Sequence, residues 1–269
     1  TANLPAPAIT DPSAHFKPII YEGTGAELST GDTDVEALDF QPDFVWIKNR
    51  DEDDSNMLYD SVRGATKDLH SDSADAETET AQTLKSFDAN GFTLGTDVQV
   101  NTDDENYVAW CWKAGGEPTA TNSATGGAMS ADSVSIDGVS QSSYTPDGSP
   151  SIYPEKLSIN TTAGFSIVSY TGTASDATVA HGLSSAPELI IARTLDNAYS
   201  WKVWHEALAN TEFLTLEDTT ARTTADTTMD STTPISSVFS VKTGQNMNVN
   251  GDRQIAYCWH GVEGYSKFG

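Results

Sequence analysis

Two acidic clusters are the first candidates for chemistry in this sequence. Asp51, Asp53 and Asp54 belong to one run of carboxylates, and Asp103 and Asp104 belong to a second run later in the chain. Oxygen-rich turns of this kind favour hard cations. Neither run matches an EF-hand loop, which needs alternating Asp or Asn, a central Gly and a terminal Glu. The clusters are therefore either a Ca²⁺ or Mg²⁺ site or a solvated acidic face, and no other cofactor is expected.

A group of aromatic residues offers a second kind of site, because aromatic rings cover the apolar faces of sugars. In an extended segment Tyr199 and Trp201 share one side, and Trp204 lies on the other. Trp204 aligns with Tyr59 in the internal repeat described below, which favours a core position. Trp201 aligns with Asn56 and has no aromatic counterpart. We therefore expect Trp201, with Tyr199, to be the sugar-binding candidate.

The cysteines and histidines fit structural roles. Cys111 and Cys258 occupy equivalent positions of the repeat, so a disulfide would have to join two equivalent interior strands, and buried thiols are expected instead. The five histidines have no metal-ligand spacing. The sequence has no nucleophile elbow, phosphate loop or dinucleotide fingerprint. We expect no enzymatic activity. The alternative is a glycosidase, whose paired carboxylates are defined in space rather than in sequence.

These residues are positioned by an internal duplication. Segments around Phe16, Pro42 and Cys111 recur in the same order later in the chain. The offsets are 149 residues for Phe16 and Phe165, 145 for Pro42 and Pro187, and 147 for Cys111 and Cys258. Chance matches would not keep both order and spacing, so the sequence predicts two copies of one domain.

The repeat sets the expected domain organisation. It predicts an N-terminal arm over residues 1–15, a first copy over 16–114, a connection rich in Gly, Ser and Thr over 115–162, and a second copy over 163–269. The connection holds small hydrophobic islands that favour a hairpin. The arm is Pro-rich and without periodicity, which predicts an extended assembly arm with Leu4, Pro5, Pro7 and Ile9 as its contact residues.

Short β-branched and aromatic segments separated by Gly, Asp, Asn and Ser predict a fold of strands. We expect two tandem jelly-roll-like β-sandwich domains. The apolar run 44–47 indicates a strand that is covered on both faces. Alternation around Cys111 puts Ala109 and Cys111 on one face of a strand and Trp110 and Trp112 on the other. The best helix candidate is the segment from Asp75 to Phe87.

Composition restricts the partners. The chain has 39 acidic and 14 basic residues and a net charge of −25. Self-repulsion at this density favours a saline setting, bound cations or both. Nucleic acid and anionic membranes are disfavoured as partners. No apolar run spans a bilayer and no secretory signal is recognisable, so we expect synthesis in a cytoplasm without an export signal.

Long distinctive motifs lie at residues 40–50, 90–97, 107–113, 163–172 and 262–269, and a further one opens the chain at residues 3–12. These motifs resemble a repeat domain found in virion structural and tail-fibre-like proteins of marine tailed phages. The resemblance implies a jelly roll of the concanavalin and laminin-G type, carried in several copies on phage appendages, with no established catalytic residues. Related chains often continue past the Gly-Tyr-Ser-Lys-Phe-Gly motif into a further copy. We therefore expect a short member or a fragment.

The resemblance and the composition together predict a non-enzymatic structural protein on the exterior of a virion. Fibre or receptor-binding protein and capsid decoration protein both stay open. The expected partners are other capsid or tail proteins and further copies of this chain in a homo-oligomer assembled through strand edges. The alternative is a carbohydrate-binding module that contacts glycans on a host surface.

Overall fold

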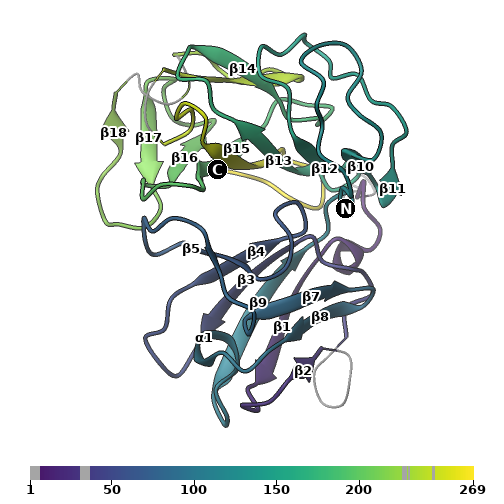
Figure 1. The fold of residues 1–269 in the computed structure, drawn as a ribbon, viewed down its shortest axis with the longest axis vertical. Coiled ribbons are helices and arrows are strands. Elements are labelled where there is room, and N and C mark those ends of the chain that lie inside the picture. The colour runs from purple at the N-terminus through teal and green to yellow at the C-terminus, as the bar shows by residue number, and fades with distance from the viewer. Residues whose placement is uncertain (1–6, 31–36, 226–228, 230, 244–245) are drawn as a thin grey trace, which may run out of the picture.

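The computed structural model describes residues 7–30, 37–225, 229, 231–243 and 246–269, and these fold almost entirely into β-strands. Figure 1 shows two lobes, the first copy in purple and blue and the second in green and yellow. The described helices are one short 3₁₀ turn, Pro12–Ala14, and α1, Val98–Asn101. None of them is long and apolar enough to cross a bilayer. The predicted all-β fold with two tandem sandwiches is confirmed.

The first domain consists of a main sheet and a smaller second sheet. The main sheet has the order β1-β9-β3-β4-β5-β6, formed by β1 (Phe16–Glu22), β9 (Asn106–Trp112), β3 (Phe44–Asn49), β4 (Met57–Asp60), β5 (Lys67–His70) and β6 (Thr78–Glu79). The second sheet has the order β2-β8-β7, formed by β2 (Leu28–Ser29), β8 (Gly91–Leu94) and β7 (Leu84–Asp88).

The second domain repeats this plan and extends it. Its main sheet includes the series β13 (Phe165–Thr171), β20 (Arg253–Trp259), β15 (Leu189–Thr194), β16 (Lys202–His205), β17 (Glu212–Thr215) and β18 (Thr223–Thr224). Beside β13 the same sheet continues with β12 (Lys156–Asn160), β10 (Val134–Ile136) and β11 (Val139–Ser140). Opposite it lies the pair β14 (Ala177–Ala180) and β19 (Val238–Val241).

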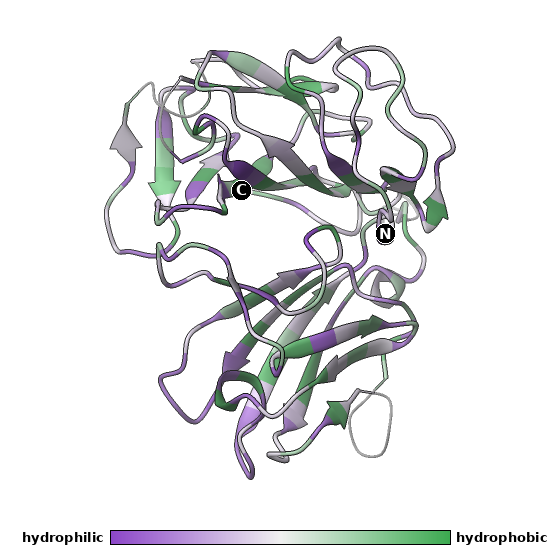
Figure 2. Cartoon of the chain, in the orientation of Figure 1, coloured by the Kyte–Doolittle hydropathy of each residue, from purple (hydrophilic) through white to green (hydrophobic). Residues whose placement is uncertain are grey.

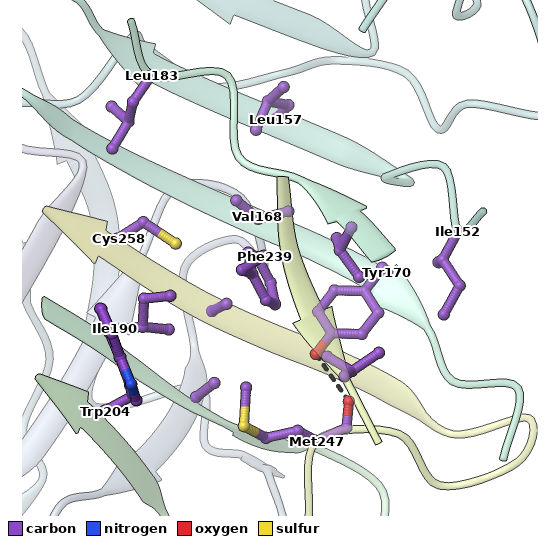
Figure 3. Close-up of a cluster of buried hydrophobic side chains, with 14 of the residues drawn as sticks. Ile152, Leu157, Val168, Tyr170, Leu183, Ile190, Trp204, Phe239, Met247 and Cys258 are labelled. Carbon is purple, nitrogen blue, oxygen red and sulfur yellow. Dashed lines mark hydrogen bonds between the residues drawn. The ribbon is translucent and has the colours of Figure 1, made fainter. Parts of the chain in front are cut away.

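The duplication extends to individual buried hydrogen bonds. The Tyr21 hydroxyl donates to the Val100 carbonyl over 2.7 Å, and Tyr170 donates to Met247 over 2.8 Å at the equivalent place, as Figure 3 shows. Equivalent asparagines each accept from the amide of a threonine near the end of the first strand: Asn101 from Thr24 and Asn248 from Thr173. The repeat therefore preserves polar contacts as well as apolar ones.

In each sandwich the core lies against the face of the main sheet that carries an alanine and a cysteine, Ala109 and Cys111 in the first domain and Ala256 and Cys258 in the second. Cys111 and Cys258 are fully buried free thiols in the two intra-domain cores, and burial raises the pKa of both. Trp204 and Tyr59 occupy corresponding core positions, so both predictions are confirmed. Figure 3 shows Cys258 and Trp204 in the core of the second domain. Figure 2 shows that hydrophobic residues concentrate on strands while loops are largely polar.

The connection between the copies adds strands to the main sheet of the second domain. A hairpin is present in the connection, formed by β10 and β11 around Asp137 and Gly138, which both have positive φ. The two hydrophobic islands themselves, β10 and β12, pair in parallel, and β12 then pairs with β13. Gly115 fixes this arrangement, because its amide donates to the Ser158 hydroxyl over 2.8 Å.

The first strand of the repeat lies at the edge of the main sheet in the first domain but inside it in the second. At position 18 the backbone nitrogen points away from β9, because the peptide groups of Lys17 and Ile19 are the ones that face β9. Proline removes that donor, which blunts the edge against pairing. Ile167, the equivalent residue of the second copy, faces β12 and pairs with it. An assembly through open strand edges, as expected from the sequence, would therefore lack one hydrogen-bond donor along β1.

The helix predicted from Asp75 to Phe87 is wrong. The described backbone there is a loop followed by β6, a turn and β7. Peptide groups that a helix would use are bound to the second domain instead. Arg193 donates to the carbonyls of Ala74 and Asp75, and the Glu77 amide donates to the Leu195 carbonyl over 2.8 Å. Tertiary contacts override a weak helical pattern here.

Gly115→Ala tests the close packing of the connection. A Cβ atom at this position would lie 2.2 Å from the Ser135 carbonyl oxygen and 2.4 Å from the Ile159 nitrogen. Since both obstacles are backbone, we expect a loss of about 1–3 kcal/mol in the free energy of unfolding, measured by urea denaturation. Gly126→Ala is the control, because no atom lies within 4 Å of its added Cβ. Equal stability of the two variants would contradict this account.

Candidate functional site

The two domains pack main sheet against main sheet through the faces turned away from their own cores. We call this buried set the inter-domain layer; its members are Phe44, Leu58, Val62, Leu69, Ala114, Phe165, Ile167, Ile191, Leu195, Trp201, Val203, Ile255, Tyr257 and Trp259. Both main sheets are thus covered on both faces, as the apolar run 44–47 predicted. The layer fixes the relative position of the two copies.

Aromatic rings of the two copies meet across the layer, and one pair comes from equivalent positions. Trp112 and Trp259 occupy the same place in the repeat, and their centroids are 6.4 Å apart in an edge-on arrangement. Phe44 stacks on Tyr257 with a centroid separation of 4.4 Å. Contacts between equivalent residues are characteristic of the isologous interfaces of symmetric dimers. Such aromatic pairs add about 0.5–1.5 kcal/mol each beyond the burial of their area.

A buried polar network lies beside these rings. The Tyr257 hydroxyl donates to the Asp60 carboxylate over 2.7 Å, and Arg63 pairs with Asp60 and with Glu77. Burial opposes the charge of Arg63, but the neighbouring Asp60 and Glu77 outweigh it and raise the pKa of Arg63. Arg253 of the second domain bonds the other oxygen of Glu77 over 2.9 Å. Charges from both domains are therefore mutually satisfied.

Trp201 belongs to this interface and does not form an exposed sugar platform, so the prediction of Trp201 as a binding residue is wrong. Its side chain is fully buried, and its indole N–H donates to the His70 carbonyl over 2.7 Å. The Arg193 guanidinium lies 4.9 Å from the centre of its ring. Tyr199 is half-buried and lies before β16. The missing counterpart of Trp201 in the first copy reflects an asymmetric contact with that copy.

The five predicted cation-binding aspartates do not converge on one point. Asp51 accepts from the backbone and side-chain amides of Asn106, which lowers its pKa, and Asp54 accepts from Asn49 over 2.7 Å. Asp53, Asp103 and Asp104 are exposed. Among the residues that the structure describes, no group of three or more His, Cys, Asp or Glu is arranged to hold a metal ion. A cation site at these turns stays a prediction.

The N-terminal segment contacts its own chain. Ile9 is buried, and the Ala8 amide donates to the Glu263 carbonyl over 3.1 Å. Ile9 is therefore not available as an assembly contact, which corrects the prediction for this residue. Pro7 is exposed. Leu4 and Pro5 lie outside the described residues.

An aromatic cleft opens at one margin of the inter-domain layer. It has a volume of about 430 Å³, and both domains and the C-terminal segment line it. The lining residues are His15, Phe16, Phe44, Trp46, Trp112, Lys113, Ala163, Phe165, Leu189, Ile191, Trp259, Tyr265, Ser266, Lys267 and Phe268. A concave, largely apolar site with a few polar groups is the usual form of a small-molecule site.

The sequence does not predict this cleft, although it contains part of the signal. Strand alternation predicts that Trp110 and Trp112 share one face. It does not predict that the second domain packs against this face. Trp46 and Trp112 retain partial exposure because the cleft separates the domains here. The C-terminal residues Tyr265, Lys267 and Phe268 reach the cleft only through the tertiary fold.

These features define an all-β protein of two copies joined face to face. A family described as "Domain of unknown function (DUF7483)" matches residues 11–153 and again residues 151–269. The chain therefore belongs to this family and carries its domain twice in tandem. No curated protein and no solved structure matches the sequence.

Tyr257→Phe tests the polar contact between the domains. The substitution keeps the ring that stacks on Phe44 and removes the donor to Asp60. Because the buried carboxylate then lacks one partner, we expect the free energy of unfolding to fall by about 1–3 kcal/mol. Tyr199→Phe is a matched control, since none of the described residues bonds to its hydroxyl. A change in Tyr257→Phe no larger than in the control would refute the assigned role.

His181 gives a prediction for the dependence of stability on pH. Burial lowers its pKa to about 4, and its ring is held between the Ile235 carbonyl and the Leu183 amide. In the unfolded chain the ring takes up a proton below its ordinary pKa of about 6.5, which the folded chain does not do until about pH 4. Its contribution is therefore complete above pH 6.5 and is lost as pH falls.

Urea denaturation between pH 7 and pH 4 measures this effect. We expect the wild type to lose about 3 kcal/mol more than His181→Gln over that range. The control is His205→Gln, in which a half-exposed histidine is replaced. Parallel pH profiles for the wild type and His181→Gln would show that His181 is not responsible.

Proposed function

We propose that this protein is a non-enzymatic structural component on the exterior of a virion, in a fibre, receptor-binding or capsid-decoration role. The observation that carries the proposal is the face-to-face union of the two copies by the inter-domain layer and its polar network. A union of this kind makes a rigid block. Many side chains that could do chemistry, including Cys111, Cys258, Asp60, Arg63 and His181, are occupied in packing or hydrogen bonds.

Charge and sequence resemblance give additional support. The net charge of −25 suits a protein that works in a saline exterior medium and disfavours a role at nucleic acid. The long motifs resemble those of virion structural and tail-fibre-like proteins of marine tailed phages. Other virion proteins and further copies of the chain are the proposed partners.

Quantitative analysis of purified particles tests this proposal. Particles of a phage that encodes the chain should contain it and should bind an antibody against it in electron micrographs. A decoration protein should be abundant and in simple stoichiometry with the major shell protein, whereas a receptor-binding protein should be scarce. Absence of the chain from the particles, or release of reducing sugar from host polysaccharide by the purified protein, would contradict the proposal.

Carbohydrate binding is the second proposed function, and the aromatic cleft is the specific observation in its favour. Sugar rings stack on partly exposed aromatic side chains. Half-buried Trp46 and Trp112 line the cleft, whereas Trp201 is inaccessible. A glycan-binding role is compatible with a position on the exterior of a particle.

A further inference from the structure

We infer that the inter-domain cleft binds an acidic saccharide, a sugar unit that carries a carboxylate or a sulfate. The aromatic wall receives the sugar ring, and Lys113 and Lys267 receive its negative charge. This inference rests on the proposed carbohydrate-binding function and specifies its site and the class of its ligand.

The aromatic wall offers both stacking surface and hydrogen-bond donors. Trp46, Trp112 and Trp259 all line the cleft. Their indole N–H groups have no acceptor among the described residues, in contrast to that of Trp201. They are also absent from the buried polar atoms without partners, a group that includes the Trp204 N–H, so solvent can reach them. Hydroxyl or acidic oxygens of a sugar are suitable acceptors for such donors.

The charged side chains that line the cleft are lysines. The chain has 39 acidic residues, yet none of them lines the cleft in the part of the chain that the structure describes, whereas Lys113 and Lys267 do. Neither lysine forms an ion pair with any part of the chain that the structure describes. The buried carboxylate of Asp43, which precedes Phe44 of the wall, accepts from Ser61 and from the Ala114 amide, and the charge of Lys113 also acts on it. No carboxylate of the described lining competes with an anionic ligand for the two ammonium groups within the cleft.

The volume of the cleft and the net charge of the chain further restrict the class of ligand. A volume of about 430 Å³ lies within the range of sites that take a small molecule, which here means one or two sugar units. A neutral apolar ligand would cover the rings but displace water from the indole donors without replacing its hydrogen bonds. A long polyphosphate would meet the net charge of −25 outside the cleft. A sugar unit with one anionic group can stack on the aromatic rings, accept hydrogen bonds from the indole donors and pair with the lysines.

Titration calorimetry on the full chain tests this inference with three probes of equal length: an oligo-uronate, a sulfated galactan oligosaccharide and a neutral β-glucan oligosaccharide. We expect an acidic probe to bind about tenfold more tightly than the neutral one and to weaken as salt is raised. The two acidic probes distinguish a carboxylate from a sulfate. Intrinsic tryptophan fluorescence should change on binding.

Variants locate the site. Lys113→Gln combined with Lys267→Gln should weaken the acidic probe about tenfold. Arg50→Gln removes the same type of charge from an exposed residue that does not line the cleft, and it should bind as the wild type does. Trp46→Phe keeps an aromatic ring and removes the indole donor, and it should weaken both acidic and neutral probes. Thermal melting confirms that each variant is folded.

Each other outcome has a distinct meaning. Equal binding of neutral and acidic probes that is unaffected by the lysine variants would overturn the acidic ligand but leave carbohydrate binding intact. No binding of any probe would overturn both. Binding unchanged in the lysine and Trp46 variants would place the site elsewhere and refute the assignment to the cleft.

Discussion

The contact of Tyr257 with the first domain is the interaction on which the rest of the structure depends. Its ring stacks on Phe44, and its hydroxyl binds Asp60. Asp60 in turn pairs with Arg63, which also reaches Glu77, and Glu77 meets Arg253 of the second domain. A buried charge without a partner is strongly destabilising, so the buried members Asp60, Arg63 and Glu77 require one another. The apolar layer and the polar network therefore hold the copies in one relative position.

This constraint explains why two copies of one domain differ where they do. A strict repeat would place the same residues on both sides of the layer. The structure instead has Trp201 and Arg193 on the second copy: Trp201 reaches the end of β5 in the first copy, and Arg193 reaches the loop that follows β5. The first strands differ as well, since Pro18 blunts one edge and β12 covers the other. Divergence is concentrated at positions where the two copies have different neighbours.

Much of the fold could be predicted from the sequence because its signals are local or repeated. The offsets between copies and the alternation around Cys111 each depend on neighbouring residues or on the duplication. The loop at residues 71–77 could not be predicted, because its peptide groups are bound by Arg193 from more than one hundred residues away. Trp201 was misassigned for the same reason: absence of a counterpart indicates a special role but not whether that role is burial or binding. The cleft depends on how the copies pack, which no local pattern encodes.

Differential scanning calorimetry of the full chain tests the central claim most directly. If the inter-domain layer and its network unite the copies, the protein should unfold in a single transition with equal calorimetric and van't Hoff enthalpies. Two separate transitions, each with the enthalpy of one domain, would show that the copies fold independently and would contradict the account.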